Sequence, residues 1–340
     1  MRQPCEILMR PICLARLLAA LALVATSLAP LWPGEAMAQS GAWPTRTVRF
    51  IVPFTPGGAN DLLPRIFAER MQGTLGQSVV VENRPGAGSN LGTANAASQP
   101  PDGYTLLLAS VAHVVNVSFF LKLPYDPIKS FEPVTMVATI PFVLTVNPAL
   151  GVSSVKELIA LLREKPGSTY ATAGIGTSHH LGAELLRTMT DLQLTHVPYK
   201  GAAGIVPALL ANEVTFSIAS ISTLVPHFKS GKLRALAVAG SERTPLLPEV
   251  PTIAEAGGLP GFAIDVWFGV LAPAGTPRSI VDRLNSEINA IVRDQNVVRD
   301  KFAPVGLSPV GSTPERFMEV MKADLAKYAR IAKEANIKPE

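Results

Sequence analysis

The chain has 340 residues, of which 48% are hydrophobic and 16% charged, and its formal net charge is +4. A chain of this size tends to divide into two domains. The positive charge is spread thinly, without runs of like charge, so nucleic acid is not an expected partner.

The first residues predict a secretory signal peptide. A basic start precedes a short apolar stretch at 17–28, and "AMA" at 36–38 matches a small-x-small cleavage site. The apolar stretch is shorter than the roughly 20 residues of a membrane-spanning helix, so export with cleavage near Ala38 is expected instead of anchoring. Cys5 and Cys13 both fall in this leader, so no disulfide and no cysteine metal site is expected after cleavage.

Strand-like and helix-like segments then alternate, which predicts an α/β fold with mainly parallel sheets. Apolar, β-branched runs predict strands at 47–53, 78–82 and 104–110. Helical spacing of apolar residues predicts a helix at 61–75, and a small-residue stretch predicts another at 85–99.

The alternation restarts after "FVLTVNPALGVSS" and produces a second unit of similar size. Helices are predicted at 154–165, 178–189 and 202–213, and strands at 168–174, 192–198, 214–220 and 232–240. A long apolar segment at 262–277 precedes two predicted helices at 277–294 and 313–335. Two α/β units in an exported chain indicate two lobes that close on a small ligand.

Two strand–turn–helix stretches are candidate anion sites. "FTPGGAND", residues 54–61, follows a strand and opens a helix, at the end of the sheet where ligand crevices form. Its glycines leave the backbone accessible, and the first N–H groups of a helix are unpaired. "YATAGIGTSHH", residues 170–180, repeats this pattern with hydroxyl groups that donate without charge. The alternative is a pair of plain tight turns.

The histidines are weaker candidates. His179 and His180 are neighbours on a helix and therefore do not share a face, so a packed or exposed imidazole is favoured over a metal site. His196 alternates within an apolar strand and is expected in the core or at its rim. His113, which follows a predicted strand, is better placed to contact a ligand.

The sequence contains few candidate catalytic residues. The chain has no Gly-x-Ser-x-Gly elbow and no metal-ligand cluster, and Asp61 is the only acid in the stretches expected at the cleft. A binding protein without cofactor or metal is therefore favoured over an enzyme.

Several blocks resemble one protein family in this order: "WPTRTVRFIVPFTPGGAND", "VVVENRPGAGSNLGT", "PPDGYTLLLAS", "KLPYDPIKSFEPV", "THVPYKGAA", "PHFKSGKLRALAV" and "WFGVLAPAGTP". The chain resembles the Bug-type substrate-binding receptors of tripartite tricarboxylate transporters. The resemblance implies a two-lobed periplasmic binding protein of type II with two crossing strands. It also implies a carboxylate ligand held by backbone N–H groups, hydroxyl groups and water.

The resemblance and the strand ends together predict the boundaries of the two lobes and the residues of the site. The expected lobes are 43–143 plus 263–340, and 144–262, after a leader at 1–38. Ser110, His113 and Ser220 lie at strand ends and join the residues that the resemblance implies. Those residues are Phe54, Gly58, Ala59, Asn60, Asp61, Thr172, Gly176, Thr177 and Ser178.

The expected partners are a small carboxylate and the membrane subunits of a permease. A sensor kinase in place of the permease, or a periplasmic hydrolase, are the alternatives. The family often carries an Asp near the cleft where this chain has Ala219. Because a buried ammonium group needs an anionic partner, carboxylates without an amino group are the expected ligands. A monomer is expected.

Overall fold

The computed structural model describes residues 43–334, and its main compact unit begins at Pro44. The predicted leader at 1–38, its cleavage site and both cysteines lie outside the described residues. Within the described part, no helix is both long and apolar enough to cross a membrane.

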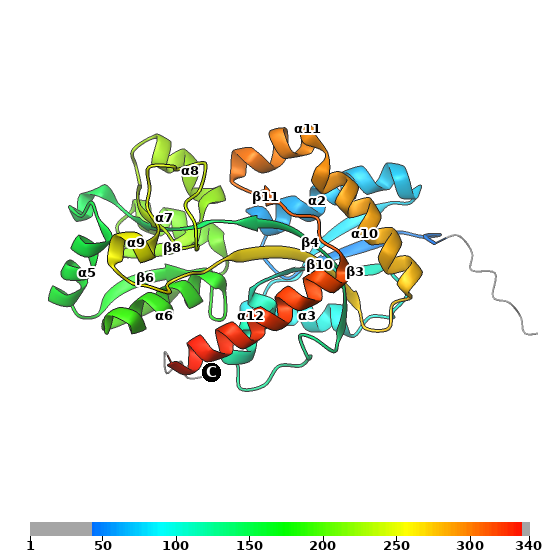
Figure 1. Ribbon diagram of the computed structural model, residues 1–340, viewed down its shortest axis with the longest axis horizontal. Coiled ribbons are helices and arrows are strands. Elements are labelled where there is room, and N and C mark those ends of the chain that lie inside the picture. Colours follow the sequence, from blue (N-terminus) through cyan, green and yellow to red (C-terminus); the bar gives the residue numbers. More distant parts are fainter. Residues whose placement is uncertain (1–42, 335–340) are drawn as a thin grey trace, which may run out of the picture. The chain divides into compact units, whose positions relative to one another are not determined.

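The first sheet has six strands in the order β11-β4-β10-β3-β1-β2 (Figure 1). Its strands are β1 (Val48–Val52), β2 (Val79–Asn83), β3 (Thr105–Ser110), β4 (Phe131–Ile140), β10 (Val266–Pro273) and β11 (Ser308–Pro309). β1 pairs in parallel with β2 and β3, whereas β10 runs antiparallel to β3 and β4, and β11 antiparallel to β4. Every residue of β3 and β10 is buried, as expected of central strands covered on both faces.

The second sheet has five strands in the order β7-β6-β8-β5-β9. They are β5 (Phe142–Val146), β6 (Ser168–Thr172), β7 (Leu194–Pro198), β8 (Phe216–Ser220) and β9 (Arg234–Val238). β6 pairs in parallel with β7 and β8, and β5 is antiparallel to β8 and β9. The predicted two-lobed α/β class is confirmed, but each sheet is mixed and not mainly parallel.

The mixed character comes from the segments that connect the sheets. β4 of the first sheet passes directly into β5 of the second, with only Pro141 between them. β10 returns beside β4 as its antiparallel neighbour, and the two strands cross the middle of the molecule together (Figure 1). A strand that leaves one sheet for the other must be matched by one that returns, and the returning strand is necessarily antiparallel.

Helices cover both sheets. They are α2 (Ala59–Leu75), α3 (Asn90–Ala97), α4 (Ala112–Val115), α5 (Val155–Glu164), α6 (Ser178–Thr190), α7 (Ile205–Leu210), α8 (Ile221–Lys229), α9 (Ile253–Gly257), α10 (Arg278–Arg293), α11 (Gln295–Val297) and α12 (Pro314–Glu334). Shorter helical turns lie at Ala87–Ser89, Asn116–Ser118, Pro148–Leu150, Ala202–Gly204, Val298–Phe302 and Ala303–Val305. The sequence analysis missed β4, β5, β11, α4, α8, α9 and α11 as elements.

The C-terminal helix α12 packs against β10 through an aromatic contact and a hydrogen bond. Phe317 packs edge-on against Trp267, with ring centroids 5.1 Å apart, and the Trp267 indole donates a hydrogen bond to Asp324 at 2.7 Å. A Cβ at Gly269 would collide with the Phe317 ring. The absence of a side chain at Gly269 therefore sets how closely this helix approaches the first sheet.

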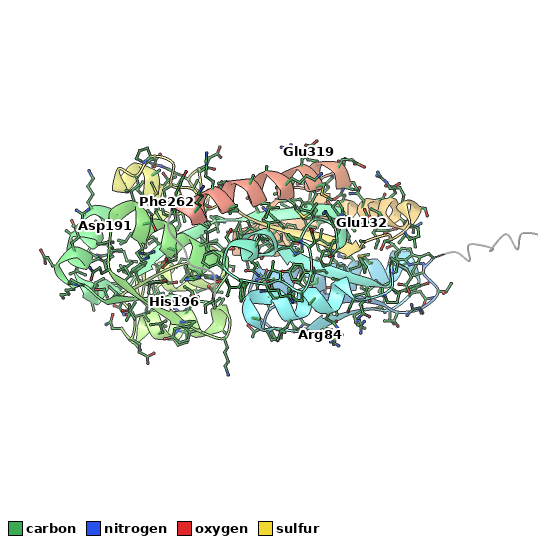
Figure 2. All side chains as sticks on the ribbon, turned by 90° about the horizontal axis from the view of Figure 1, so that it is seen from below. Arg84, Glu132, Asp191, His196, Phe262 and Glu319 are labelled. Atoms are coloured by element: carbon green, nitrogen blue, oxygen red, sulfur yellow. The ribbon has the colours of Figure 1, made fainter. Side chains whose placement is uncertain are left out.

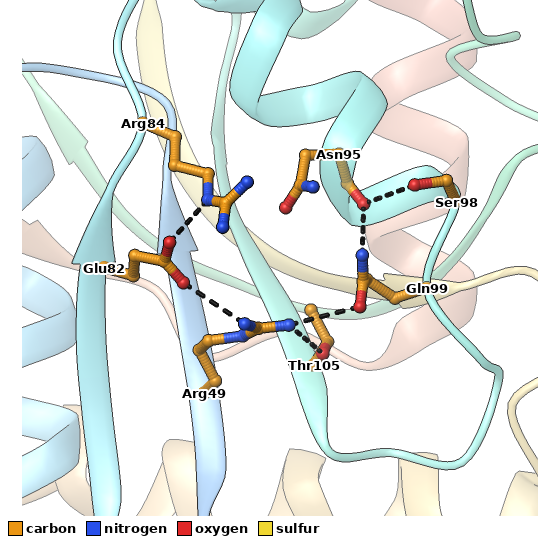
Figure 3. Close-up of polar contacts among 7 residues, drawn as sticks. All are labelled: Arg49, Glu82, Arg84, Asn95, Ser98, Gln99 and Thr105. Atoms are coloured by element: carbon orange, nitrogen blue, oxygen red, sulfur yellow. Dashed lines mark hydrogen bonds and ion pairs between the residues drawn. The ribbon is translucent and has the colours of Figure 1, made fainter.

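A charged network ties the three parallel strands of the first sheet together (Figure 3). The Glu82 carboxylate accepts from Arg84 Nε at 2.5 Å and from Arg49 Nη1 at 3.3 Å. Nη2 of Arg49 donates to Gln99 Oε1 at 3.1 Å and to Thr105 Oγ1 at 3.4 Å. This Arg49–Glu82–Arg84 network links β1, β2, β3 and the end of α3.

Candidate functional site

A small cavity of about 50 Å³ lies where the two sheets meet. Its wall includes eight of the twelve predicted site residues: Phe54, Gly58, Ala59, Asn60, Ser110, Thr177, Ser178 and Ser220. Phe54 and Gly58 belong to the turn after β1, and Ala59 and Asn60 begin α2. Ser110 and Ser220 end β3 and β8, and Thr177 and Ser178 lie at the start of α6. The ends of strands from both sheets therefore converge on one point.

The turn after β1 opens helix α2 toward the cavity. Gly57 and Gly58 have φ values of 93° and 81°, in the left-handed region that favours glycine. Gly58 is the N-cap, and no side chain caps the helix there. Since the first N–H groups of a helix have no intrahelical partner, those of Ala59 and Asn60 remain available to a ligand.

Helix α6 opens toward the same cavity from the second sheet. Thr177 is its N-cap, again without a side-chain cap, so the N–H groups of Ser178 and His179 have no partner within the helix. The Thr177 hydroxyl donates to the Gly174 carbonyl at 2.6 Å. Its proton is therefore used inside the turn, and donation from this hydroxyl to a ligand stays a prediction.

A third helix start, which the sequence analysis missed, completes the wall. Helix α8 begins after Ser220, whose hydroxyl lies 2.9 Å from the Ser222 hydroxyl, and Ser222 and Thr223 both line the cavity. A Ser at the end of a strand before "ISTLVPHFK" is a helix-start signal, because a Ser at the N-cap favours a helix. Its identification would have added Ser222 and Thr223 to the predicted site.

The polar groups around the cavity carry no full charge. None of the described residues in its wall is Asp, Glu, Lys or Arg. Each helix N-terminus carries roughly half a positive charge from its aligned peptide dipoles. Three such ends at one place, together with the neutral serine and threonine hydroxyls, favour a carboxylate over a cation.

The other four predicted residues lie outside this wall. Asp61 accepts from Arg65 at 2.9 Å and from Asn83 at 2.9 Å, and its carboxylate also receives the Gly57 N–H at 3.2 Å. Burial opposes ionisation, but these hydrogen bonds lower the pKa of Asp61 below its usual value. It is therefore an ionised structural group that holds the glycine turn, as a carboxylate three residues past the N-cap often does.

His113, Thr172 and Gly176 are placed by packing. His113 is buried between Tyr125 and Phe131 and lies 2.8 Å from the Pro127 carbonyl oxygen, and burial lowers its pKa to about 4. Thr172 Oγ1 pairs with His196 Nε2 at 2.6 Å. A side chain on Gly176 would collide with the Asn116 amide oxygen, so this glycine permits a close contact between the two lobes.

His180 belongs to an aromatic stack in the second lobe. Its ring lies 4.2 Å from the ring of His196, which in turn stacks on Tyr170 at 5.0 Å. Figure 2 shows His196 in the part of the molecule built on the second sheet. Burial lowers the pKa of His180 to about 3, and no group of three or more potential ligands within residues 43–334 is arranged to hold a metal ion.

A larger cavity of about 500 Å³ adjoins the first and shares Phe54, Thr55, Ala173, Thr177 and Gly201 with it. Its wall is mostly apolar and continues through Gly86–Ser89 and Phe120 to Tyr199 and Lys200. Ile175 lines this outer cavity, while Ala112 lines the inner one. Ala219, which we expected near the cleft, is buried in β8 opposite Val143 and lines neither.

A cavity enclosed by two lobes and lined with neutral donors defines the class of solute-binding receptors. Comparison with known proteins identifies the family: residues 63–337 match the model of the tripartite tricarboxylate transporter family receptor. The chain belongs to this family.

Individual relatives agree with this assignment. The chain is 38% identical over 299 residues to the protein BugT of Bordetella pertussis, covering 87% of this chain and 91% of BugT. It is 37% identical to the structure of R. palustris Rpa4515 with adipate, with a TM-score of 0.83, covering 88% of this chain and all of the other. MatC from Rhodopseudomonas palustris with bound malate is 32% identical, with a TM-score of 0.80, covering 85% of this chain and all of MatC.

Proposed function

We propose that this protein is an exported receptor that binds a small organic carboxylate between two lobes and delivers it to a membrane permease. The observation that carries the proposal is the convergence of the α2, α6 and α8 N-termini on a cavity without charged side chains. Donors from both sheets line that cavity, so a bound carboxylate would bridge the lobes and favour their closure.

The ligand's body would extend into the outer cavity. The inner cavity, at about 50 Å³, is too small for more than a carboxylate and its nearest atoms, whereas the adjoining one holds about 500 Å³. Adipate, found in the structure of Rpa4515, and malate, bound in that of MatC, are both dicarboxylates, which supports the ligand class for this chain. In the proposed lobes, residues 43–143 plus 263–340 form one and 144–262 the other.

The proposed location is the periplasm, after removal of the leader near Ala38. The leader's sequence pattern and the receptor family both support export. The family role of receptor also supports a non-catalytic protein that needs no cofactor or metal. The family is named as a transporter receptor, which supports delivery to a permease, and a sensor kinase is the alternative recipient.

Thermal unfolding with a panel of mono- and dicarboxylates tests the binding function. A ligand at 100 times its Kd stabilises the native state by about 2.7 kcal/mol, which raises the melting temperature by several degrees. Matching amino acids, such as aspartate beside succinate, serve as controls, because the cavity wall offers no acid for an ammonium group. If no carboxylate stabilises the protein, or if it turns over carboxylate esters or amides, the proposal fails.

A further inference from the structure

The wall of the inner cavity contains three polar atoms with no hydrogen-bond partner. Both ring nitrogens of His179 and the amide oxygen Oδ1 of Asn60 are buried and unpaired, and both residues line the cavity. His179 is only 8% exposed and packs against Phe142, with ring centroids 4.7 Å apart. A phenyl ring supplies no conventional partner, whereas a ligand or water in the cavity would supply one.

The three atoms differ in what they require. Burial lowers the pKa of His179 to about 3, so the imidazole is neutral at physiological pH. A neutral imidazole has one N–H donor and one acceptor nitrogen, and the Asn60 oxygen is a second acceptor. The site therefore requires partners for one donor and two acceptors, and leaving such groups unpaired when buried is costly.

A carboxylate alone does not meet this requirement. An ionised carboxylate only accepts hydrogen bonds, so it satisfies the His179 N–H and leaves both acceptors unpaired. The ligand must also bring a donor. An ammonium group is a poor choice, because no Asp or Glu is among the described residues of the wall. A hydroxyl group donates one proton without bringing a charge, so it pairs with one of the two acceptors, and water or a hydroxyl group of the wall pairs with the other.

We propose that His179 and Asn60 recognise a hydroxyl group carried by the ligand close to its bound carboxylate. This inference rests on the proposed carboxylate-binding function and narrows its ligand to hydroxycarboxylates. His179 is then a specificity-determining residue, since its imidazole pairs with both the hydroxyl and the carboxylate.

Matched ligand pairs that differ by one hydroxyl test the proposal. We would measure the Kd of malate and succinate, lactate and propionate, and mandelate and phenylacetate by calorimetry. For the pair that binds, the hydroxylated member is expected to bind about tenfold more tightly, as for one added hydrogen bond at a desolvated site. Equal affinities within a pair would overturn the proposal and indicate that water serves these atoms.

The variant His179→Phe separates recognition from packing. It keeps an aromatic ring beside Phe142 and removes both nitrogens, so the preference for the hydroxylated ligand should disappear. His113→Phe is the matched control: it removes another buried imidazole that lies outside the cavity wall, and should keep the preference. Each preference is a ratio within one variant, so a change in stability does not affect it.

The outcomes remain distinguishable from failure of the proposed function. Carboxylate binding without a hydroxyl preference, or a preference that survives in His179→Phe, rejects the role of His179 alone. Absence of binding by every carboxylate in the panel rejects the receptor function and this inference with it.

Discussion

The inner cavity and the Arg49–Glu82–Arg84 network use polar groups in opposite ways. In the network, the Glu82 carboxylate lies 2.5–3.3 Å from nitrogens of Arg84 and Arg49, and Nη2 of Arg49 is also paired. In the cavity wall, side chains are uncharged, and buried atoms of His179 and Asn60 have no partner.

Polar groups that stabilise the fold are already paired, whereas polar groups that are available to a ligand are unpaired. A network whose charges are already satisfied has nothing to offer an incoming molecule, but it fixes the register of three strands. Unpaired neutral groups cost stability in the empty protein, and a ligand recovers that cost when it binds. Neutral donors also avoid the desolvation penalty of burying a lysine or arginine together with the carboxylate.

The largest effect is expected where a side chain would keep the lobes apart. A Cβ at Gly88 would collide with the Ile175 carbonyl oxygen, so Gly88→Ala should prevent closure. The affinity for the best carboxylate should fall by about 100-fold, close to 3 kcal/mol. Calorimetry measures this directly.

Gly231→Ala is the matched control for that variant. Gly88 and Gly231 have similar φ values of 61° and 69°, so both substitutions strain the backbone, but a Cβ at Gly231 meets nothing within 4 Å. Gly231→Ala should therefore leave the affinity unchanged. An equal loss in both variants would show that backbone strain, and not lobe contact, is responsible.

Acid should destabilise the protein through the cavity histidine. The pKa of His179 is about 3 in the folded state and near 6.5 when unfolded, so the unfolded state binds more protons between these values. Stability is therefore lost as the pH falls below about 6.5. Urea unfolding at pH 7 and pH 4.5 should show a loss about 2 kcal/mol smaller in His179→Phe than in the wild type. An identical loss in both would exclude a buried neutral His179.

The network should affect stability and not binding. Glu82→Gln removes the central charge, and because the carboxylate is about one-third exposed, the free energy of unfolding should fall by only about 1 kcal/mol. Carboxylate affinity should not change. Glu319→Gln, which removes an exposed partner of Arg316 on α12, should leave stability unaltered (Figure 2). A loss of affinity in Glu82→Gln would mean that the two regions are coupled.

Thr177 should affect both stability and binding, each only slightly. Since its hydroxyl is paired with the Gly174 carbonyl, Thr177→Val should cost about 1 kcal/mol of unfolding free energy and reduce the affinity less than tenfold. Chemical denaturation and calorimetry on the same variant test both. A larger loss of affinity at unchanged stability would place the hydroxyl on the ligand, as the sequence analysis expected.

Local patterns in the sequence were sufficient to predict the elements that lead to the site. The glycine pair at 57–58 and the turn at 174–177 predicted two helix starts facing a ligand, because glycine at positive φ and unpaired helix N–H groups are local properties. The alternation of strand-like and helix-like segments predicted the α/β class, and the sequence blocks predicted the family; both are confirmed by the comparisons.

Tertiary structure decided which side chains face the cavity. Asp61 and Thr177 each have a partner within their own turn, and nearby groups compete with a ligand for the same hydrogen bond, so ligand contact by either residue stays a prediction. His179 was expected to be packed or exposed; it packs against Phe142, and its unpaired nitrogens in the cavity wall were not anticipated. Burial and pairing depend on residues far apart in the chain, such as Phe142 beside His179, and no local pattern encodes that proximity.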